Sequence, residues 1–513
     1  MAATEADNST LDYDALPPLY QDRAFWGMSI TQFLGAFNDN VFKQIVLFLS
    51  MSVLLAGVSE PQDRQFLANG VFALPFVLFS GIAGYCSDRV RKKYLIVGCK
   101  VAEIVVMLAA VVTFLTMPSP ELGKHVRNFG DVSVENDIYF MPGVPWLLLA
   151  VLFLMGMQSA WFGPAKYGIL PEMVRGSDLP RFNGVIQMTT FVAIVLGIWL
   201  GGWLLDRLRD SLVTAGMCCV GIAVIGTVTS LFVRSTPVAQ RQGKFRSSDF
   251  ASGAETWRIL REDRTLGRAL VVYSAFWFVA ALLPMTINWL GVFQFQKNYE
   301  TTSLMLAGSS VGIAAGFVVA GRMSHKQVRF GLVRIGAWGL VTCLVLASLP
   351  AGMPASGADF GPSVTGNGGT RTTPADAASI AALSRAALSR AALSRADDGT
   401  RIFSEDVEVD VWPHLLGYQG SRVLFVVMGF FTGLFALPVQ VYLQSKPPRH
   451  LKGRVIGSMN LVTWFAILLA AGCFFGADVM LAKLQLPKYF IFGLAALVLL
   501  PIAMLYRPAD VEL

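Results

Sequence analysis

Apolar residues are gathered along the chain into twelve runs that are separated by polar stretches. Each run approaches or exceeds the length of about 20 residues that a helix needs to cross the hydrocarbon core of a bilayer. Helices are the expected form because lipid offers the backbone no hydrogen-bond partners, and the runs are too long and uniform for barrel strands. The runs are Phe25–Ala56, Phe66–Cys86, Tyr94–Thr116, Val144–Phe162, Asn183–Leu205, Ser211–Val233, Ala269–Phe293, Thr302–Ala320, Phe330–Leu349, Ser421–Gln444, Ile456–Asp478 and Tyr489–Tyr506. The pattern predicts an all-α membrane protein with twelve transmembrane helices.

The composition supports this prediction and excludes several other classes of protein. Of the 513 residues, 54% are hydrophobic and 15% are charged, against roughly 25% charged in soluble domains. The net charge of +7 comes from basic residues in loops between the runs, which does not indicate nucleic-acid binding. The six cysteines lie within the runs, and the four histidines form no metal-binding motif. We therefore expect no cofactor, no metal and no nucleic-acid partner, and we exclude an ordinary cytosolic enzyme.

Basic residues are unequally shared between successive loops, and this bias predicts the orientation of the chain. One set of loops is rich in lysine and arginine, as in 89–93 and 234–268, whereas the alternate set is poor. The rich set is expected to face the cytoplasm, so both termini are predicted to be cytoplasmic. The N-terminus is acidic and lacks the basic region of a signal peptide, so the first run is expected to remain as a helix.

The long loop between runs six and seven divides the helices into two groups of six. The two halves also resemble each other around Pro164 and Pro438, which indicates a two-lobed transporter with a central cavity. The outer segment 351–420 contains three tandem A-A-L-S-R pentads; we interpret it as a low-complexity loop, with a partner-binding arm as the alternative. The expected parts are a cytoplasmic tail (1–24), an N-terminal six-helix bundle (25–233), a cytoplasmic inter-bundle loop (234–268), a C-terminal six-helix bundle (269–506) and a cytoplasmic tail (507–513).

Run one carries a group of polar residues in the stretch F-N-D-N-V-F-K. At about 1.5 Å per residue, Asp39 lies about 20 Å into the run, where a charge is costly and usually functional. Lys43 follows one turn later, so an Asp39–Lys43 ion pair is available, and Asn38 and Asn40 add donors and acceptors. We interpret these four residues as a polar site that faces the cavity; the alternative is an ion pair that holds run one to a neighbouring helix.

Other polar residues within the runs are further candidates for the cavity. Glu103 lies one turn after Lys100 in run three, and a structural pair between them is at least as reasonable as a substrate contact. For each of the remaining amides, a hydrogen bond to a neighbouring helix is the favoured alternative. These amides are Gln187, Asn288 and Gln440.

A proline-containing stretch links runs four and five. Pro164 and Pro171 predict that the helix breaks there, because proline removes a backbone donor and clashes with the preceding turn. Lys166 is then placed near the cytoplasmic headgroups, where it can attract a phosphate. A lysine that only sets the topology is the alternative.

The stretch that ends run two reads G-I-A-G-Y-C-S-D-R-V-R-K-K. Its small residues permit close helix contacts, its aspartate can stabilise a helix N-terminus, and its basic residues can pair with carboxylates or lipid phosphates. It resembles the cytoplasmic loop motif G-x-x-x-D-R-x-x-R-[RK] of the major facilitator superfamily. The resemblance implies a conformational latch between the lobes, whereas a plain basic loop is the alternative. The latch residues would be Gly81, Asp88, Arg89, Arg91 and Lys92.

Several stretches together resemble the bacterial lysophospholipid transporter family within that superfamily. They are Phe37–Lys43, Phe162–Glu172, Thr190–Gly197, Leu437–Gln444 and Lys452–Asn460. The resemblance implies two six-helix bundles that work by alternating access in the bacterial cytoplasmic (inner) membrane, as a monomer that moves lysophospholipids to the inner leaflet. A partner acyltransferase would be a separate protein, because no histidine here begins the H-x-x-x-x-D motif. The family usually has an acidic residue near Gln187 and a second asparagine after Asn460, where this chain has Leu461.

Two further functions fit the sequence. One is a proton-coupled transporter of a soluble sugar, peptide or drug, with Asp39 and Glu103 as the protonation candidates. The other is a transport-inactive membrane scaffold or receptor that binds a partner through 351–420. A membrane-embedded enzyme is not expected, because no nucleophile–base pair or metal constellation occurs among the intramembrane polar residues.

Overall fold

A computed structural model gives the three-dimensional structure of the chain. It describes residues 16–51, 63–117, 121–129, 132–140, 146–175, 178–208, 211–236, 261–295, 297–324, 327–351, 392–395, 401–406, 414–446, 452–484, 486–508 and 510–512. Residues 1–15 of the expected N-terminal tail, 237–260 of the inter-bundle loop and most of 351–420 lie outside this part of the chain. The side chain of Asp88 lies outside it as well.

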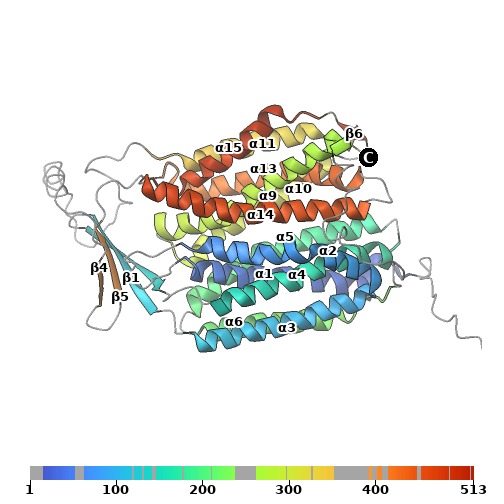
Figure 1. Ribbon diagram of the computed structural model, residues 1–513, viewed down its shortest axis with the longest axis horizontal. Coiled ribbons are helices and arrows are strands. Elements are labelled where there is room, and N and C mark those ends of the chain that lie inside the picture. Colours follow the sequence, from blue (N-terminus) through green and yellow to red (C-terminus); the bar gives the residue numbers. More distant parts are fainter. Residues whose placement is uncertain are drawn as a thin grey trace, which may run out of the picture.

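The described helices form two bundles that lie side by side (Figure 1). The first bundle contains α1 (Arg23–Leu49), α2 (Gln65–Arg89), α3 (Lys92–Thr116), α4 (Trp146–Met173), α5 (Leu179–Arg207) and α6 (Leu212–Ser230). The second contains α9 (Arg264–Trp289) with a π-helical turn (Leu290–Gln294), α10 (Tyr299–Ser324), α11 (Phe330–Ser348), α13 (Gly417–Ser445), α14 (Lys452–Lys483) and α15 (Phe490–Leu505). Each helix overlaps one of the predicted apolar runs, so the nearly all-helical membrane fold is confirmed.

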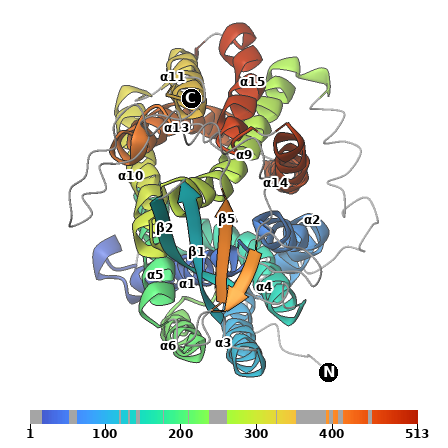
Figure 2. The same ribbon diagram turned by 90° about the vertical axis from the view of Figure 1, so that its left-hand side faces the viewer.

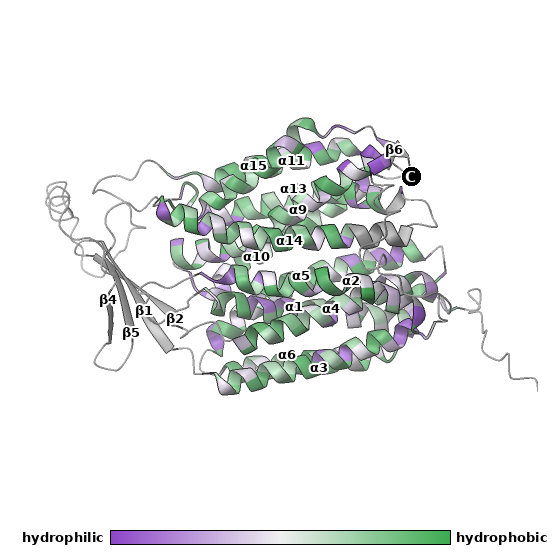
Figure 3. Cartoon of the chain, in the orientation of Figure 1, coloured by the Kyte–Doolittle hydropathy of each residue, from purple (hydrophilic) through white to green (hydrophobic). Residues whose placement is uncertain are grey.

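Ten of these helices are long and apolar enough to cross a membrane, and hydrophobic residues cover most of their length (Figure 3). The other two are α1, which carries Arg23, Asp39 and Lys43, and α15, which has 16 residues. A total of twelve crossings therefore stays a prediction for these two helices.

The predicted break in the fourth helix is wrong. Both Pro164 and Pro171 lie inside α4, which continues to Met173. A proline inside a membrane helix is tolerated where neighbouring helices pack around it, and α4 packs along α2 and α3. Lys166 is consequently a helical residue, about 10 Å before the end of α4 at 1.5 Å per residue, rather than a loop residue.

Close packing inside the second bundle depends on glycine. Gly312 and Gly316 on α10 face the backbone of α13, and Gly429 and Gly433 on α13 face the backbone of α10. At Gly433 an added Cβ would come within 2.6 Å of the Ile313 carbonyl oxygen. Spacings of four residues between glycines are typical of membrane helices whose backbones touch.

A four-stranded sheet lies beyond one end of the bundles, and the sequence analysis did not predict it (Figures 1 and 2). Its order is β2 (Val132–Phe140), β1 (Glu121–Phe129), β5 (Arg401–Asp406) and β4 (Ala392–Arg395). Strands β1 and β2 lie between α3 and α4, whereas β4 and β5 belong to the segment between α11 and α13. Because β1 pairs in parallel with β5, the sheet joins the two bundles.

The sheet distinguishes the two ends of the molecule. We call the end beside it the sheet end, where α1 and α3 finish and α2 and α4 begin. We call the opposite end the terminus end, because α1 begins and α15 finishes there (Figure 1). A short pairing of β3 (Gln327–Val328) with β6 (Val511–Glu512) also lies at the terminus end.

Candidate functional site

Two of the four candidate polar residues of α1, Asn38 and Asp39, belong to two different clusters within the first bundle. The first is a buried triad of Asn38, Lys100 and Glu103. The Lys100 ammonium lies 2.6 Å from one carboxylate oxygen of Glu103, and the Asn38 amide donates to the other oxygen at 2.8 Å. All three side chains are at most 2% exposed. The Lys100–Glu103 pair expected one turn apart is therefore present, and it joins α3 to α1.

The second cluster surrounds Asp39 on the side of α1 that faces α4. Ser159 donates to one carboxylate oxygen of Asp39 at 2.6 Å, and Gln158 approaches the other at 3.4 Å. Lys166 lies about two turns after Ser159 on α4. It is 8% exposed, and its ammonium lies 4.3 Å from the centre of the Tyr167 ring. Lys166 attracts the Asp39 carboxylate electrostatically. The half-buried Asp39 carboxylate thus has both a hydroxyl donor and a nearby cation.

The hypothesis of a direct Asp39–Lys43 ion pair is wrong. Within the described side chains, no ion pair joins the two residues, although their charges still attract each other. The Lys43 ammonium lies 4.9 Å from the centre of the Phe72 ring on α2. The oxygens of Asp39 already accept hydrogen bonds from α4, so the helical spacing alone does not bring the lysine onto them.

The other predicted cavity residues do not gather around Asp39. The Asn40 side chain donates to the Ala36 carbonyl of its own helix at 2.7 Å and faces the close contact of α1 with Gly197 on α5. Gln187 on α5 and Gln440 on α13 are half-buried, and neither has a side-chain hydrogen bond to any residue that the structure describes. These two amides remain available to a ligand.

The predicted latch residues lie at the terminus end of α2 and the start of α3. Lys92 is 3% exposed, and its ammonium lies 2.5 Å from the Glu172 carboxylate on α4. The Arg89 guanidinium lies 4.0 Å from the centre of the Tyr85 ring. Gly81 is a residue of α2, and Arg91 is the residue before α3. The Lys92 pair lies within the first bundle, so a latch between the two bundles stays a prediction.

Asn288 belongs to a network of amides that connects the bundles at the sheet end. Its side chain accepts from Gln44 on α1 at 3.1 Å and donates to Gln65 on α2 at 3.0 Å. Gln44 also approaches Ser303 on α10 at 3.3 Å, and Gln65 donates to the Met285 carbonyl at 3.2 Å. The four side chains of this sheet-end network, including Ser303, are at most 2% exposed. The hydrogen bond to a neighbouring helix that the sequence analysis favoured for Asn288 is therefore present, whereas its partners Gln44 and Gln65 were not identified from the sequence.

Two further contacts of charged side chains connect the bundles at the sheet end. Asp206, near the end of α5, accepts from the first backbone amides of α10 at Tyr299 and Glu300, at 3.3 and 2.6 Å. A carboxylate is favourable at a helix N-terminus because the free amides and the helix dipole both attract it. Lys488 lies 3.8 Å from Asp63 of the first bundle and 2.8 Å from Asp478. Burial raises the pKa of the Asp63 carboxyl, and Lys488 opposes that shift.

The seams between the bundles are closed from the sheet end to about their middle. Along α2 and α14 the aromatic contacts between described side chains run from Phe66–Phe475 to Phe76, which stacks on Trp464 with ring centres 3.7 Å apart. Along α5 and α10 the last aromatic contact joins Phe191 to Phe317, at 4.9 Å.

Further toward the terminus end, the helices that line the seams have fewer neighbours from the other bundle. A Cβ added to Gly84 on α2 or to Gly184 on α5 would meet no atom within 4 Å. On α5, Met188 is 60% exposed. The described structure is therefore a state in which the bundles touch at the sheet end.

Replacing Asn288 by leucine is expected to open the sheet end. The change leaves the buried amides of Gln44 and Gln65 without their partner, and each such loss costs about 1–3 kcal/mol. Because every 1.4 kcal/mol is tenfold, the population open at this end should rise about tenfold or more. Pulsed electron-spin distances between labels at Leu147 and Leu484, which are 61% and 58% exposed, would report the change.

Gln440→Leu is the matched control for this prediction, because it removes a half-buried amide that has no hydrogen-bond partner among the described residues. The control should keep the distance distribution of the unmodified protein. A distribution that is also unchanged in Asn288→Leu would show that the network does not hold the bundles together.

The described residues contain no group of three histidine, cysteine or acidic side chains that can hold a metal ion. The candidate site instead consists of fixed charges in one bundle and a polar contact between the bundles. It can bind a ligand with opposite charges and can close at one end.

Comparisons with known proteins agree with this arrangement. Residues 25–392 match the sequence profile of the Major Facilitator Superfamily. The chain is 28% identical over 332 residues to "Lysophospholipid transporter LplT" of Enterobacter sp. (strain 638), covering 63% of this chain and 74% of that protein. It is 27% identical over 305 residues to the protein of the same name from Photorhabdus laumondii subsp. laumondii, covering 58% and 66%. The matched region thus spans about two thirds to three quarters of these relatives.

Solved transporter structures share the fold. The crystal structure of nucleoside transporter NupG aligns with a TM-score of 0.54 and 10% identity, covering 95% of this chain and 100% of that chain. A POT family transporter in complex with a thioalcohol-conjugated peptide aligns with a TM-score of 0.59 and 10% identity, covering 94% and 96%. At this identity the likeness concerns the fold alone.

Proposed function

Because this chain belongs to the Major Facilitator Superfamily and is a multi-pass membrane transporter, we propose that it moves lysophospholipids across the bacterial cytoplasmic membrane by alternating access. The proposal rests on the sequence similarity of this chain to relatives named lysophospholipid transporter LplT. Two stretches that resemble that family, Phe37–Lys43 and Phe162–Glu172, lie on α1 and α4 and contain Asp39 and Lys166.

The charges around Asp39 fit a zwitterionic headgroup. The carboxylate of Asp39 can accept hydrogen bonds from an ammonium or hydroxyl group, and Lys166 can pair with a phosphate. These two side chains are near enough to attract each other, so one headgroup can meet both. The aromatic pairs that end the two seams, such as Phe76 with Trp464, offer apolar surface for a single acyl chain.

The basic loops predict that the terminus end faces the cytoplasm. In that orientation the described state is closed toward the outside, and the sheet-end network forms the outer gate. Transport would require this network to break and the terminus end to close, with Lys92 and its neighbours as the proposed latch. A separate acyltransferase would then consume the imported lipid.

Ligand-induced stabilisation of the purified protein tests the substrate class. Lysophosphatidylethanolamine below its critical micelle concentration should raise the Tm, because a ligand that binds only the folded state stabilises it by mass action. Soluble glycerophosphoethanolamine has the same headgroup without the acyl chain and should raise it much less. Equal shifts from both compounds, or a shift only with sugars or peptides, would instead favour a transporter of soluble substrates.

Deletion of residues 352–412 is expected to leave transport intact, within about threefold. The two ends of this segment meet, because Pro350 and His414 form a β-bridge and the Leu415 amide donates to the Leu349 carbonyl at 3.1 Å. A short Gly-Ser link can therefore join α11 to α13 without moving either helix, and loop length has a weak effect on stability. The deletion also removes β4 and β5, but the sheet-end network still connects the bundles. Lipid translocation in proteoliposomes is the measurement.

Deletion of the interhelical residues 237–260 tests the opposite loop in the same assay and serves as the comparison. If removal of 352–412 abolishes activity in a protein that still unfolds cooperatively, the scaffold or receptor function gains support and the proposal fails in its present form.

A further inference from the structure

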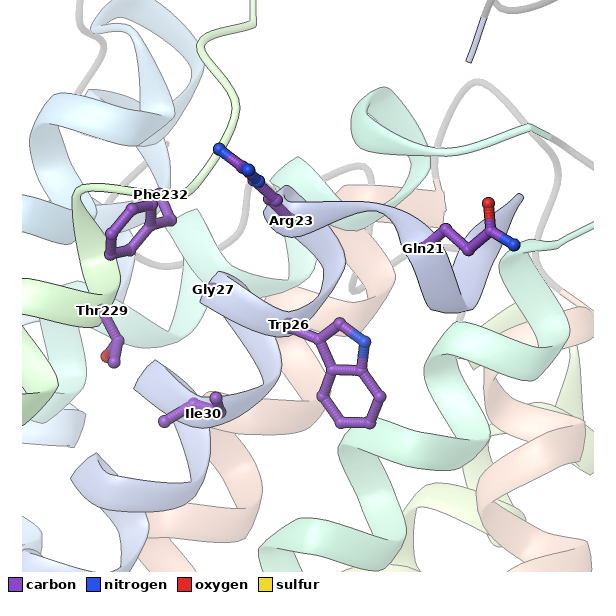
Figure 4. Close-up of a pocket in the computed structure, with 7 residues that line it drawn as sticks. All are labelled: Gln21, Arg23, Trp26, Gly27, Ile30, Thr229 and Phe232. Atoms are coloured by element: carbon purple, nitrogen blue, oxygen red, sulfur yellow. The ribbon is translucent and has the colours of Figure 1, made fainter. Parts of the chain in front are cut away.

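A groove lies on the outside of the first bundle, between the start of α1 and the end of α6 (Figure 4). It encloses about 320 Å³. Its lining includes Arg23, Trp26, Gly27 and Ile30 from α1, Thr229 from α6 and Phe232 just after the end of α6. None of these residues belongs to the site around Asp39, so the groove needs an explanation of its own.

The groove exists because α1 and α6 touch on one side only. Gly27 has no side chain, and an added Cβ would lie 2.9 Å from the Cβ of Phe232. One turn deeper, the hydroxyls of Thr31 and Thr229 are hydrogen-bonded at 3.0 Å. These contacts form the floor, and the larger side chains on either side of them form the walls.

The groove faces lipid rather than the transport path. Asp39 lies 16 positions after Arg23, which at 3.6 residues per turn puts it on roughly the opposite face of α1. Next to the groove, Ile225 and Val228 on α6 and Phe232 just after it are 56%, 51% and 57% exposed. Apolar side chains that are this exposed are the ones that a membrane helix turns toward lipid.

Along the groove, the residue types follow the order of groups in a phospholipid. Arg23 is the first residue of α1 and is exposed, with no ion pair to any residue that the structure describes. Trp26 follows about 4.5 Å deeper and Ile30 about 10.5 Å deeper, at 1.5 Å per residue. Their exposed fractions are 46% and 40%. This order matches the layers of a bilayer leaflet, with a cation at headgroup level, an indole at the interface and aliphatic groups below it.

A second cation contacts the segment that carries Phe232. The Lys93 ammonium donates to the carbonyl of Leu231, next to Phe232, at 2.9 Å. The neighbouring acidic side chain, that of Asp22 directly before α1, is paired with Arg234 at 2.9 Å. Among the residues that the structure describes here, Arg23 and Lys93 are therefore cations that no ion pair neutralises.

From this charge and this order of residues, we propose that the groove binds an anionic diacyl phospholipid of the surrounding leaflet. The phosphate of its headgroup lies on Arg23, with Lys93 beside it, and one acyl chain runs past Trp26 and Ile30 against Phe232. The lipid is a resident of the membrane and not the transported molecule. The inference requires only that α1 and α6 lie in a membrane, so it stands whether or not lysophospholipids are the substrate.

Native mass spectrometry of the full-length purified protein, titrated with phosphatidylglycerol, tests this inference. Arg23→Gln should reduce the population of the tightest phosphatidylglycerol adduct about fivefold. Arg329→Gln is the matched control: this arginine is also exposed and directly precedes a helix, α11, at the same end of the molecule. The control should bind as the unmodified protein does. Ile30→Asn, which places an amide where the acyl chain would lie, should weaken the same adduct.

Four results would overturn the inference, the last of them with a different lipid. The first is an unchanged adduct in Arg23→Gln. The second is an equal loss in Arg23→Gln and Arg329→Gln, which would indicate general attraction to basic surface. The third is displacement of the lipid by soluble glycerol 3-phosphate, which would indicate a phosphate site without a lipid preference. Phosphatidylcholine with the same acyl chains should bind more weakly and should be insensitive to Arg23→Gln, and tighter binding of phosphatidylcholine would also contradict an anionic ligand.

Discussion

Replacing Asp39 by asparagine should reduce lipid translocation by about 10- to 100-fold while the protein still folds. A hydrogen bond to a charged group contributes about 1.5–3 kcal/mol, and every 1.4 kcal/mol is tenfold. Asparagine has nearly the same shape and can still accept from Ser159, which now lies 2.6 Å from the carboxylate. The change therefore removes the charge that we assign to the substrate headgroup and little else.

Asn40→Ala is the control for Asp39→Asn. Asn40 neighbours Asp39 in the chain but bonds to the Ala36 carbonyl of its own helix, and alanine keeps the Cβ that packs against Gly197 on α5. This variant should translocate at close to the normal rate. If Asp39→Asn is as active as the control, the carboxylate has no part in transport, and the candidate site would have to lie elsewhere.

Removing Lys100 alone is expected to destabilise the protein severely. Lys100→Met leaves the Glu103 carboxylate buried without its cation, and breaking a buried pair in this way costs about 3–5 kcal/mol. The reciprocal change Glu103→Met should have a similar effect, because Lys100 and the Asn38 amide would lose their shared acceptor. Equilibrium unfolding in detergent micelles measures the free energy of unfolding.

The double variant Lys100→Met/Glu103→Met should recover a large part of this loss, because no uncompensated charge is left inside the bundle. The exposed pair of Arg181 and Asp178, 4.0 Å apart with the arginine 71% exposed, provides the comparison. Removing it should cost less than about 1 kcal/mol. Single variants as stable as the unmodified protein would mean that the Lys100–Glu103 pair is not a structural element.

Much of the helical architecture could be predicted from the sequence, because a lipid-spanning helix requires a long apolar run and the runs are uninterrupted. The exception in α4 is instructive. Pro164 and Pro171 carry a strong local signal for a helix end, but neighbouring helices compensate for the lost backbone bonds. The strands β1, β2, β4 and β5 were missed because they lie in segments that a search for apolar runs does not register.

The candidate site could be predicted only in part. Asp39 and the Lys100–Glu103 pair were found because charge is rare inside a membrane helix. The partners of Asp39 on α4 could not be predicted, because helices that are apolar all round give no periodicity that fixes which face meets which neighbour. The sheet-end network joins Gln44 to Asn288 across 244 positions of sequence, and no local pattern reports a contact of that range.

Translocation of fluorescent lysophosphatidylethanolamine by the unmodified protein in proteoliposomes tests the central claim most directly. We predict protein-dependent movement of the one-chain lipid between leaflets, no comparable movement of diacyl phosphatidylethanolamine, and a clear loss in the Asp39→Asn variant. An ionophore arm would show whether an ion gradient drives the movement. Failure of folded protein to move the one-chain lipid, together with gradient-dependent uptake of a soluble solute, would contradict the claim.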